Sequence, residues 1–374
     1  MHGDSSSSLV TFVTATLLLS ACSDGKQPHD ARQESGGSAA ATAGAGTTGG
    51  TSAGSGGRNA GGAGVAGTPG SAGTSVAGSG GTSGSGGGGS DCAPGEIGTP
   101  PQCVPAPPLP PGPGRRWTLT FDEEFDGSDY DHEKLSACFD WNYGACTSSF
   151  NKGREHYDPG QIAVSDGTAK LIAEPLMPPL SSTACFEDEC TYRSGLLSTC
   201  RPDAGNGSDY LYAFTYGYVE ARMKFPATQG FFTAFWMLPA DPNYAYRSEI
   251  DIVEILGDDP TTIFMTYHYD DRSRSHAVNQ GKFNNGDCPV RDYGDDFHTF
   301  GMDWQPDHVA WYIDGTKCDE FTGDETEIEN GPMQLIVDLM VDHSWQQDWD
   351  VTLEDTTLTR ELEVDYLRVY QLVP

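Results

Sequence analysis

Apolar and polar residues alternate with a period of two through most of the chain after residue 116. In the run 216–225, one face of an extended chain carries Val219, Ala221, Met223 and Phe225, and the other face is mostly polar. Further strands are predicted at 308–318, which enters an Asp314-Gly315 turn, at 334–341 and at 362–372. Because many short strands alternate with turn residues, we expect an all-β antiparallel sandwich of the jelly-roll type.

The chain begins with a segment that is typical of an export signal. Residues 9–21 are apolar but too few to cross a membrane as a helix. They end in Leu19-Ser20-Ala21-Cys22, which resembles a bacterial lipobox, so we expect a lipoprotein-type signal peptide at 1–21 and lipidation at Cys22. The alternative is an ordinary secretory signal with a chance cysteine. Either way, we expect the protein outside the cytoplasm, anchored in the cell envelope by lipid or secreted.

Composition divides the rest of the chain into three parts. Residues 22–90 are rich in Gly, Ser, Thr and Ala and cannot bury enough apolar surface to fold, so they predict a disordered tether. Residues 91–115 hold Cys92 and Cys103 and a proline-rich run, which predicts a small disulfide-closed loop and a stiff spacer. Residues 116–374 form the predicted folded domain.

The formal net charge of the chain is −33, and nearly all of it lies after residue 90. A surface this acidic repels nucleic acid and anionic lipid headgroups and favours a neutral or cationic ligand. Ten cysteines outside the cytoplasm predict disulfide bonds. Plausible pairs are Cys138 with Cys146, and Cys185 with Cys190 or either of these with Cys200.

Three acidic residues stand in the otherwise apolar run SEIDIVEILG, residues 248–257. In a strand, Glu249 and Asp251 share one face, and strict alternation would send Glu254 into the core. A buried unpaired glutamate is costly. We therefore predict a β-bulge at Ile252-Val253, whose extra residue returns Glu254 to the face of the other two.

This arrangement suits glycosidic bond cleavage. The two glutamate Cα atoms would lie about 13 Å apart, and inward-leaning side chains would bring the carboxyl groups to about 5–6 Å, near the separation in retaining glycosidases. One carboxylate would attack the anomeric carbon, and the other, kept protonated by the crowded negative charge, would release the leaving oxygen. The alternatives are a solvated acidic strand face and a calcium site.

The run YGYVEARMKFPATQGFFTAFWMLP (216–239), followed by SEIDIVEILG, closely resembles glycoside hydrolase family 16, especially its laminarinase-like members with a bulged strand. The resemblance spans most of residues 117–371. It implies a β-jelly roll of the concanavalin A type with a sugar-binding cleft on its concave face. It also implies retaining hydrolysis or transfer of β-1,3- or β-1,4-linked polysaccharide.

The resemblance also implies roles for single residues. Glu249 is expected to be the nucleophile, Asp251 its assistant and Glu254 the acid/base. Trp236 matches a sugar-stacking tryptophan, and His268 matches a histidine beside the acid/base; a core tryptophan and a structural histidine are the alternatives. The other residues expected to bind substrate are Trp345, Asn142, Trp141 and Glu155.

A structural calcium ion is common in this family, and the matching positions are Glu124, Gly167 and Asp365, which offer the oxygen ligands that calcium requires. Catalysis is expected to need no organic cofactor. Departures from the family pattern include Ser248 in place of glycine, Asp338 in place of asparagine, and a segment at 269–294 that is longer and more polar than usual.

The sequence thus predicts a monomeric, lipid-anchored, retaining endo-glycosidase that cuts β-1,3- or mixed-linkage β-glucan. Its expected partners are the polysaccharide and, through the anchor alone, the membrane; nucleic acid is excluded. The alternatives are a transglycosylase that remodels glucans, a non-catalytic carbohydrate-binding module, and a hydrolase of another polysaccharide such as the β-galactan agarose.

Overall fold

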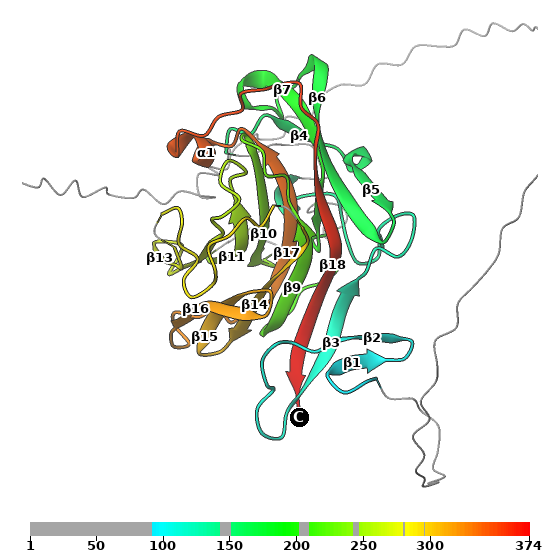
Figure 1. Cartoon of the computed structure of the whole chain (residues 1–374), viewed down its shortest axis with the longest axis vertical. Helices are drawn as coiled ribbons and strands as arrows, with labels where there is room; N and C mark the ends of the chain where they lie inside the picture. The colour runs from blue at the N-terminus through cyan, green and yellow to red at the C-terminus, as the bar shows by residue number, and fades with distance from the viewer. Residues whose placement is uncertain (1–91, 143–150, 202–208, 242–246, 280, 295) are drawn as a thin grey trace, which may run out of the picture. The chain divides into compact units, whose positions relative to one another are not determined.

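The computed structural model describes residues 92–142, 151–201, 209–241, 247–279, 281–294 and 296–374. Within these ranges the regular structure is almost entirely strand, as the alternating pattern predicts (Figure 1). The helical elements are η1 (Asp140–Asn142), η2 (Pro159–Gln161), η3 (Phe186–Asp188) and α1 (Ser344–Asp348). No helix in the described part of the chain is long and apolar enough to span a membrane.

The strands of the described residues form two large layers, which are antiparallel except for one pair of strands. One sheet has six strands in the order β13 (Arg274–Ala277), β12 (Phe264–Tyr269), β11 (Glu249–Ile255), β10 (Phe231–Pro239), β17 (Met333–Val341) and β8 (Leu196–Ser198). The path of the other sheet is β16 (Thr316–Thr322), β15 (His308–Ile313), β14 (His298–Gln305), β9 (Gly217–Lys224), β18 (Arg360–Val373), β6 (Thr168–Ser181), β7 (Glu189–Ser194) and β4 (Glu155–Tyr157), of which β7 and β4 are the parallel pair. Two further strands join this second sheet, β3 (Arg116–Glu123) beside β18 and β5 (Ile162–Ser165) beside β6.

The main hydrophobic core lies between the two sheets. Strand β9 directs Val219, Ala221 and Met223 into it, which confirms the predicted apolar face of this strand. From the six-stranded sheet, alternate residues of β10 (Phe231, Phe235 and Met237) and of β17 enter the same core. Burial of these two apolar faces is the main favourable term that holds the sandwich together.

A second apolar cluster covers the opposite, outer face of the six-stranded sheet. The intervening residues Phe232, Ala234, Trp236 and Leu238 of β10 belong to it. Phe139, Tyr157 and Trp345 pack onto the same face, Tyr157 from β4 and Trp345 from α1. Strand β10 is therefore apolar on both faces and all of its residues are buried.

The segment 92–115, predicted as a loop and a spacer outside the domain, instead packs against it. Strands β1 (Glu96–Thr99) and β2 (Gln102–Pro105) form a hairpin closed by the predicted Cys92–Cys103 disulfide. The Tyr370 hydroxyl donates a hydrogen bond to the Pro105 carbonyl (3.1 Å), and Trp117 Nε1 donates to the Leu109 carbonyl (3.0 Å). Burial of Val104 against Trp117 and Tyr370 explains the attachment.

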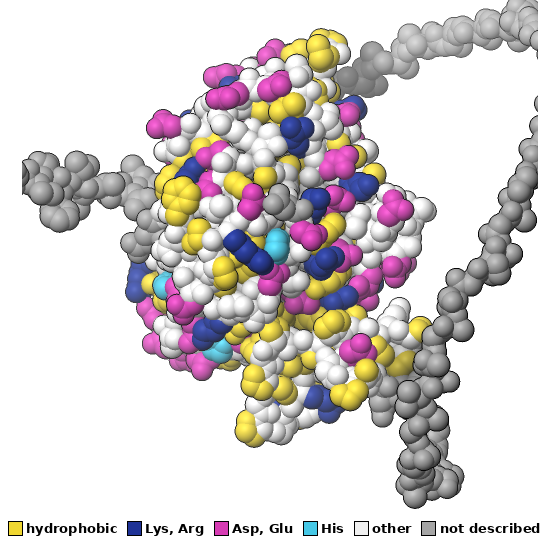
Figure 2. Space-filling view, viewed as in Figure 1, with side chains coloured by type: hydrophobic (Ala, Val, Ile, Leu, Met, Phe, Trp, Pro, Cys, Tyr) yellow, Lys and Arg dark blue, Asp and Glu magenta, His cyan; other side chains and the backbone are white. Residues whose placement is uncertain are grey.

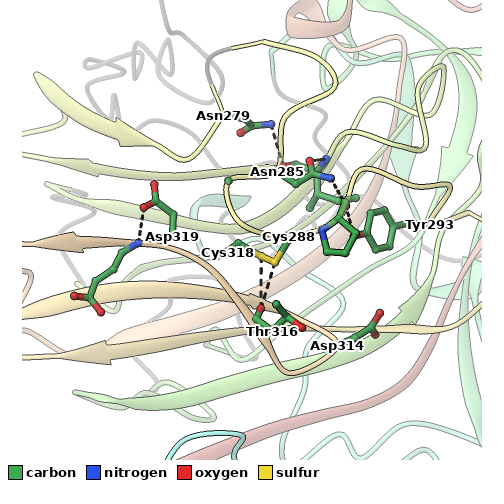
Figure 3. The surroundings of a disulfide bond; sticks show 12 residues. Asn279, Asn285, Cys288, Tyr293, Asp314, Thr316, Cys318 and Asp319 are labelled. Carbon is green, nitrogen blue, oxygen red and sulfur yellow. Dashed lines mark hydrogen bonds between the residues drawn. A yellow bond between two sulfur atoms is a disulfide. The ribbon is translucent and has the colours of Figure 1, made fainter.

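Two further cysteine pairs are visible in the described residues. Cys185–Cys190 is one of the predicted alternatives, and Cys288–Cys318 was not predicted (Figure 3). Cys138 is disulfide-bonded, but Cys146, its predicted partner, lies outside the described residues. Cys200 is a buried free thiol.

The Cys288–Cys318 bond ties the long connection between β13 and β14 to strand β16 (Figure 3). Asn285 strengthens this connection, since its side chain accepts a hydrogen bond from the Ile263 amide (2.9 Å) and donates to the Thr261 carbonyl (2.9 Å).

The acidic side chains that give the chain its charge are spread over the visible face in Figure 2.

Replacing Cys288 and Cys318 together by alanine should lower the free energy of unfolding by about 3–4 kcal/mol, because chain-entropy models give a loop of this length that stabilisation. The two cysteines are 30 residues apart, whereas Cys185 and Cys190 are 5 apart. Alanine at the shorter pair should cost only about 2 kcal/mol. Urea unfolding of both variants tests this. A larger loss from the shorter loop would contradict it.

Candidate active site

The predicted β-bulge is present in strand β11. On β10, the consecutive residues Trp236 and Phe235 pair with Asp251 and Val253, so Ile252 is the extra residue. The pairing with β12 shifts over the same stretch, between Asp251 and Glu254. The bulge predicted at Ile252-Val253 is therefore confirmed.

The bulge sends two consecutive apolar residues to one side of the strand. Ile252 and Val253 both enter the main core. Glu254 pairs with Ala234 and Asp251 pairs with Trp236, whose side chains lie on the outer face, so all three acids of β11 share that face. Each of the three acids is only 1 % exposed. Carboxyl groups buried to this extent need a cationic partner or a proton.

Two of these carboxylates face basic side chains. Glu249 Oε2 lies 3.2 Å from Arg272 Nη1, and Asp251 Oδ2 lies 3.3 Å from His268 Nε2. One oxygen each of Glu249 and Asp251 and a ring nitrogen of His268 all lie within 4.8 Å of one another. Burial tends to lower the pKa of His268, but the neighbouring Asp251 and Glu249 outweigh this and raise it. His268 therefore holds its proton more firmly than an ordinary histidine.

Glu254 is stabilised in its protonated form. Burial raises its pKa well above the usual range, and the negative charges of Asp251, Glu249 and Asp338 raise it further. Its Oε1 is buried and has no hydrogen-bond partner in the described part of the chain. A carboxyl group whose raised pKa favours the protonated form can act as a general acid.

Asp338 on β17 links the tryptophan of β10 to this group of acids. Trp236 Nε1 and the Tyr157 hydroxyl donate hydrogen bonds to its two carboxylate oxygens, each at 3.0 Å. Asp338 and Glu254 both pair with Ala234, from opposite sides, so they lie on one row across the sheet. Burial raises the pKa of Asp338 to about 7, although the two hydrogen bonds oppose the shift.

The aromatic residues expected to bind sugar gather on the same face. The Trp141 ring lies 6.3 Å from that of Trp236 and stacks on Phe139 at 4.6 Å, and it is partly exposed. Trp345 is buried and packs edge-on against Phe264, with ring centroids 4.9 Å apart. The side chain of Asn142 lies outside the described residues.

Glu155 has a different environment from the one expected. It is fully buried, and its Oε2 accepts a hydrogen bond from the Val341 amide at the end of β17 (2.9 Å). Burial raises its pKa to about 8. These contacts give Glu155 a structural role in joining β4 to β17, and they do not support the predicted contact with substrate.

The residues predicted to bind calcium do not fit an ion in this structure. Both carboxylate oxygens of Glu124 accept hydrogen bonds from Arg368, each at 2.6 Å. Asp365 forms an ion pair with Arg222, and Gly167 lies in the turn between β5 and β6. Because each carboxylate already faces a guanidinium group, a divalent cation would have to displace an arginine.

Two residues of the site were not predicted as such. Asp338 carries the same signal as the acids of β11, an acidic residue in an apolar strand, and was noted only as a departure from the family pattern. Arg272 gives no periodic signal, since it lies in the turn between β12 and β13. Only the fold brings it to Glu249.

Comparison with known proteins gives a consistent result. The sequence profile of glycosyl hydrolases family 16 matches residues 187–366, which include all of the acids of β11. The endo-1,3-1,4-β-glycanase ExsH of Rhizobium meliloti is 29 % identical over 212 residues, which are 56 % of this chain and 40 % of that protein. The chain thus spans about two fifths of the length of this relative.

Other relatives are covered more fully. A β-glucanase of Rhodothermus marinus is 28 % identical over 274 residues, covering 69 % of this chain and 86 % of that protein. Among solved structures, the endo-β-1,3-glucanase of Pyrococcus furiosus is 27 % identical with a TM-score of 0.54, and the match covers 72 % of this chain and 99 % of that one.

Asp338→Asn should change how stability depends on pH. The folded protein holds the Asp338 proton up to a pKa of about 7, whereas an unfolded aspartate loses it near pH 4. The free energy of unfolding of the wild type should therefore fall, relative to the variant, as the pH rises through this window, by up to about 4 kcal/mol. Urea unfolding between about pH 4 and 8 measures this.

The control for this experiment is Asp166→Asn, at an exposed turn position. This variant should follow the wild type at every pH. A constant difference between Asp338→Asn and the wild type across the window would contradict the assignment of a buried, proton-holding carboxyl group.

Three observations now agree on the family of this chain. Its described residues fold into a two-layer β-sandwich like that of the solved endo-glucanase. Its bulged strand places three acids on one face of the six-stranded sheet, and its profile match covers that strand. The matched part of this chain, residues 187–366, is therefore a glycoside hydrolase domain of family 16.

Proposed function

We propose that this protein is a retaining endo-glycosidase that hydrolyses β-1,3- or mixed-linkage β-glucan. The observation that carries this proposal is the pair of glutamates on one face of β11, one facing a guanidinium group and the other holding a proton. Two carboxyl groups in different protonation states are what double displacement requires. The β-glucanase names of the relatives support the substrate class.

In the proposed first step, a carboxylate oxygen of Glu249 forms a bond to the anomeric carbon while the bond from that carbon to the glycosidic oxygen breaks. Glu254 gives its proton to the departing oxygen. In the second step, a water oxygen attacks the anomeric carbon, a water proton passes to Glu254, and the ester electron pair returns to Glu249. An oxygen of Glu249 lies within 4.8 Å of the Asp251–His268 pair, so a protonated His268 would offset part of the negative charge that returns to Glu249 when the ester breaks.

Trp141 is proposed as the platform for the sugar ring, because it is partly exposed whereas Trp236 beside it is buried. The hydrogen bond from Trp236 to Asp338 fixes the plane of that buried indole. Aromatic faces of this kind pack against the C–H faces of pyranose rings. Glu249 and Glu254 lie on one strand with only the bulge between them. We therefore expect their carboxyl groups to lie at the short separation of retaining enzymes, which attack covalently, and not at the wider separation that holds a water molecule in inverting enzymes.

Glu249→Ser should reduce the hydrolysis of laminarin by at least about 10⁴-fold while the fold is retained. The measurement is a reducing-sugar assay with laminarin, lichenan, agarose and κ-carrageenan, together with NMR of the first-formed anomer. We expect wild-type cleavage of laminarin or lichenan and a β product. Glu361→Ser, an exposed glutamate on β18, serves as control and should remain active.

Cleavage of laminarin by Glu249→Ser, or an inverted product from the wild type, would contradict the mechanism. Adding an oligosaccharide acceptor separates hydrolysis from transfer, since a transglycosylase would make longer chains. Cleavage of agarose in place of the glucans would show that the substrate is a β-galactan.

We also propose that Cys22 carries lipid and holds the enzyme at the outside of the cell envelope. The support is the run Leu19-Ser20-Ala21-Cys22 after an apolar stretch, all of it outside the described residues. Cys22→Ser should move the protein from the membrane fraction to the soluble fraction and abolish labelling with a palmitate analogue. Equal fractionation of the two proteins would contradict lipidation.

A further inference from the structure

The turn between β12 and β13 has an unusual backbone. Three consecutive residues other than glycine have positive φ angles, namely Asp270 (55°), Asp271 (53°) and Arg272 (60°). Such residues are costly in this region. The turn is closed by two hydrogen bonds to the Asp270 carbonyl, from the Ser273 amide (3.0 Å) and from the Ser273 hydroxyl (2.6 Å). It belongs to the segment 269–294, whose length and polarity depart from the family pattern.

Of the two arginines in or just after this turn, only Arg272 points toward Glu249 on strand β11. Arg272 lies 3.2 Å from the Glu249 carboxylate, and its side chain is only 19 % exposed. Arg274, two residues later, points elsewhere: it pairs with Glu327 at 2.9 Å, lies over the Tyr269 ring and is half exposed. The two arginines therefore offer a matched comparison within one hairpin.

We propose that Arg272 is a positioning residue for the nucleophile: the β12–β13 turn holds its guanidinium group against Glu249 and so fixes both the direction and the charge of that carboxylate. This inference rests on the proposed function, in which Glu249 attacks the anomeric carbon. An opposite charge at this distance favours the ionised form of a carboxyl group.

Other groups around Glu249 also influence the charge state of its carboxyl group. Its own strand contributes Asp251 and Glu254, and β12 contributes its pairing partner His268. Strand β10 contributes the uncharged Trp236, and Asp338 lies beyond it on β17. Strand β14 packs on the core side of β11. Among these groups Arg272 alone is permanently charged and positive, so it opposes the crowding of three acids.

The pairing has opposite effects on the two chemical steps. By favouring the carboxylate, Arg272 makes Glu249 a weaker nucleophile in the first step and a better leaving group in the second. Without Arg272, the ester should form readily once Glu249 is ionised but break down more slowly. Accumulation of the glycosyl-enzyme is thus a readout that a merely structural arginine would not change.

The test compares Arg272→Met, Arg272→Lys and the control Arg274→Met. The first readout is the pH dependence of kcat/KM on laminari-oligosaccharides, whose acidic limb reports the free enzyme. In Arg272→Met this limb should move to higher pH by about one to three units. Lysine should restore most of the shift, and Arg274→Met should follow the wild type. An unmoved limb in a folded Arg272→Met enzyme would overturn the proposal.

The second readout is the release of phenol from an activated aryl β-laminaribioside above neutral pH. Arg272→Met should show a burst that approaches one equivalent of enzyme, and this burst should exceed that of the wild type and of Arg274→Met. A burst that is equal in all three proteins would also contradict the assigned role.

A third measurement does not depend on activity. Urea midpoints are compared for the wild type, Arg272→Met, Glu249→Gln and the double variant. If the two side chains pair, Arg272→Met should lower the midpoint when Glu249 is present and have little effect in the Glu249→Gln background. Additive effects would overturn the pairing. If the wild type cuts no glucan, the proposed function fails, and this cycle alone decides whether the pair exists.

Discussion

The candidate active site depends on a single extra residue in strand β11. Because Ile252 and Val253 both enter the core, the strand keeps its apolar contacts and still turns Glu254 to the outer face. With strict alternation, Glu254 would lie in the core between the sheets, where an unpaired carboxyl group is costly. Core packing thus fixes the register of Glu249 and Glu254, and their chemistry follows from it.

The negative charge of each buried acid on this face is offset by a different partner. Glu249 faces Arg272, Asp251 faces His268, and Glu254 keeps its proton. Asp338 accepts hydrogen bonds from two aromatic side chains. The protonation states of these acids are coupled, because in a low-dielectric environment the charge of each one changes the pKa of its neighbours. The site is therefore one electrostatic unit in which Glu249 faces a positive charge and Glu254 holds a proton.

Local pattern and the cost of burying Glu254 were enough to predict the strands, the bulge and the acids of β11 from the sequence. What could not be predicted depends on contacts between distant parts of the chain. Arg272 reaches Glu249 only through a turn with three positive φ angles, and Cys288 meets Cys318 across two strands. Likewise, Glu124 looks like a calcium ligand until the fold places Arg368 against it.

If the bulge makes Glu249 and Glu254 act on one glycosidic bond, Glu249 forms the covalent link to the sugar. Trapping with a 2-deoxy-2-fluoro laminaribiosyl fluoride, followed by peptide mass spectrometry, tests this directly. We expect one sugar unit per protein, attached at Glu249. A label on Glu254 or on another residue, or a wild-type enzyme that turns over glucan without ever forming a label, would contradict it.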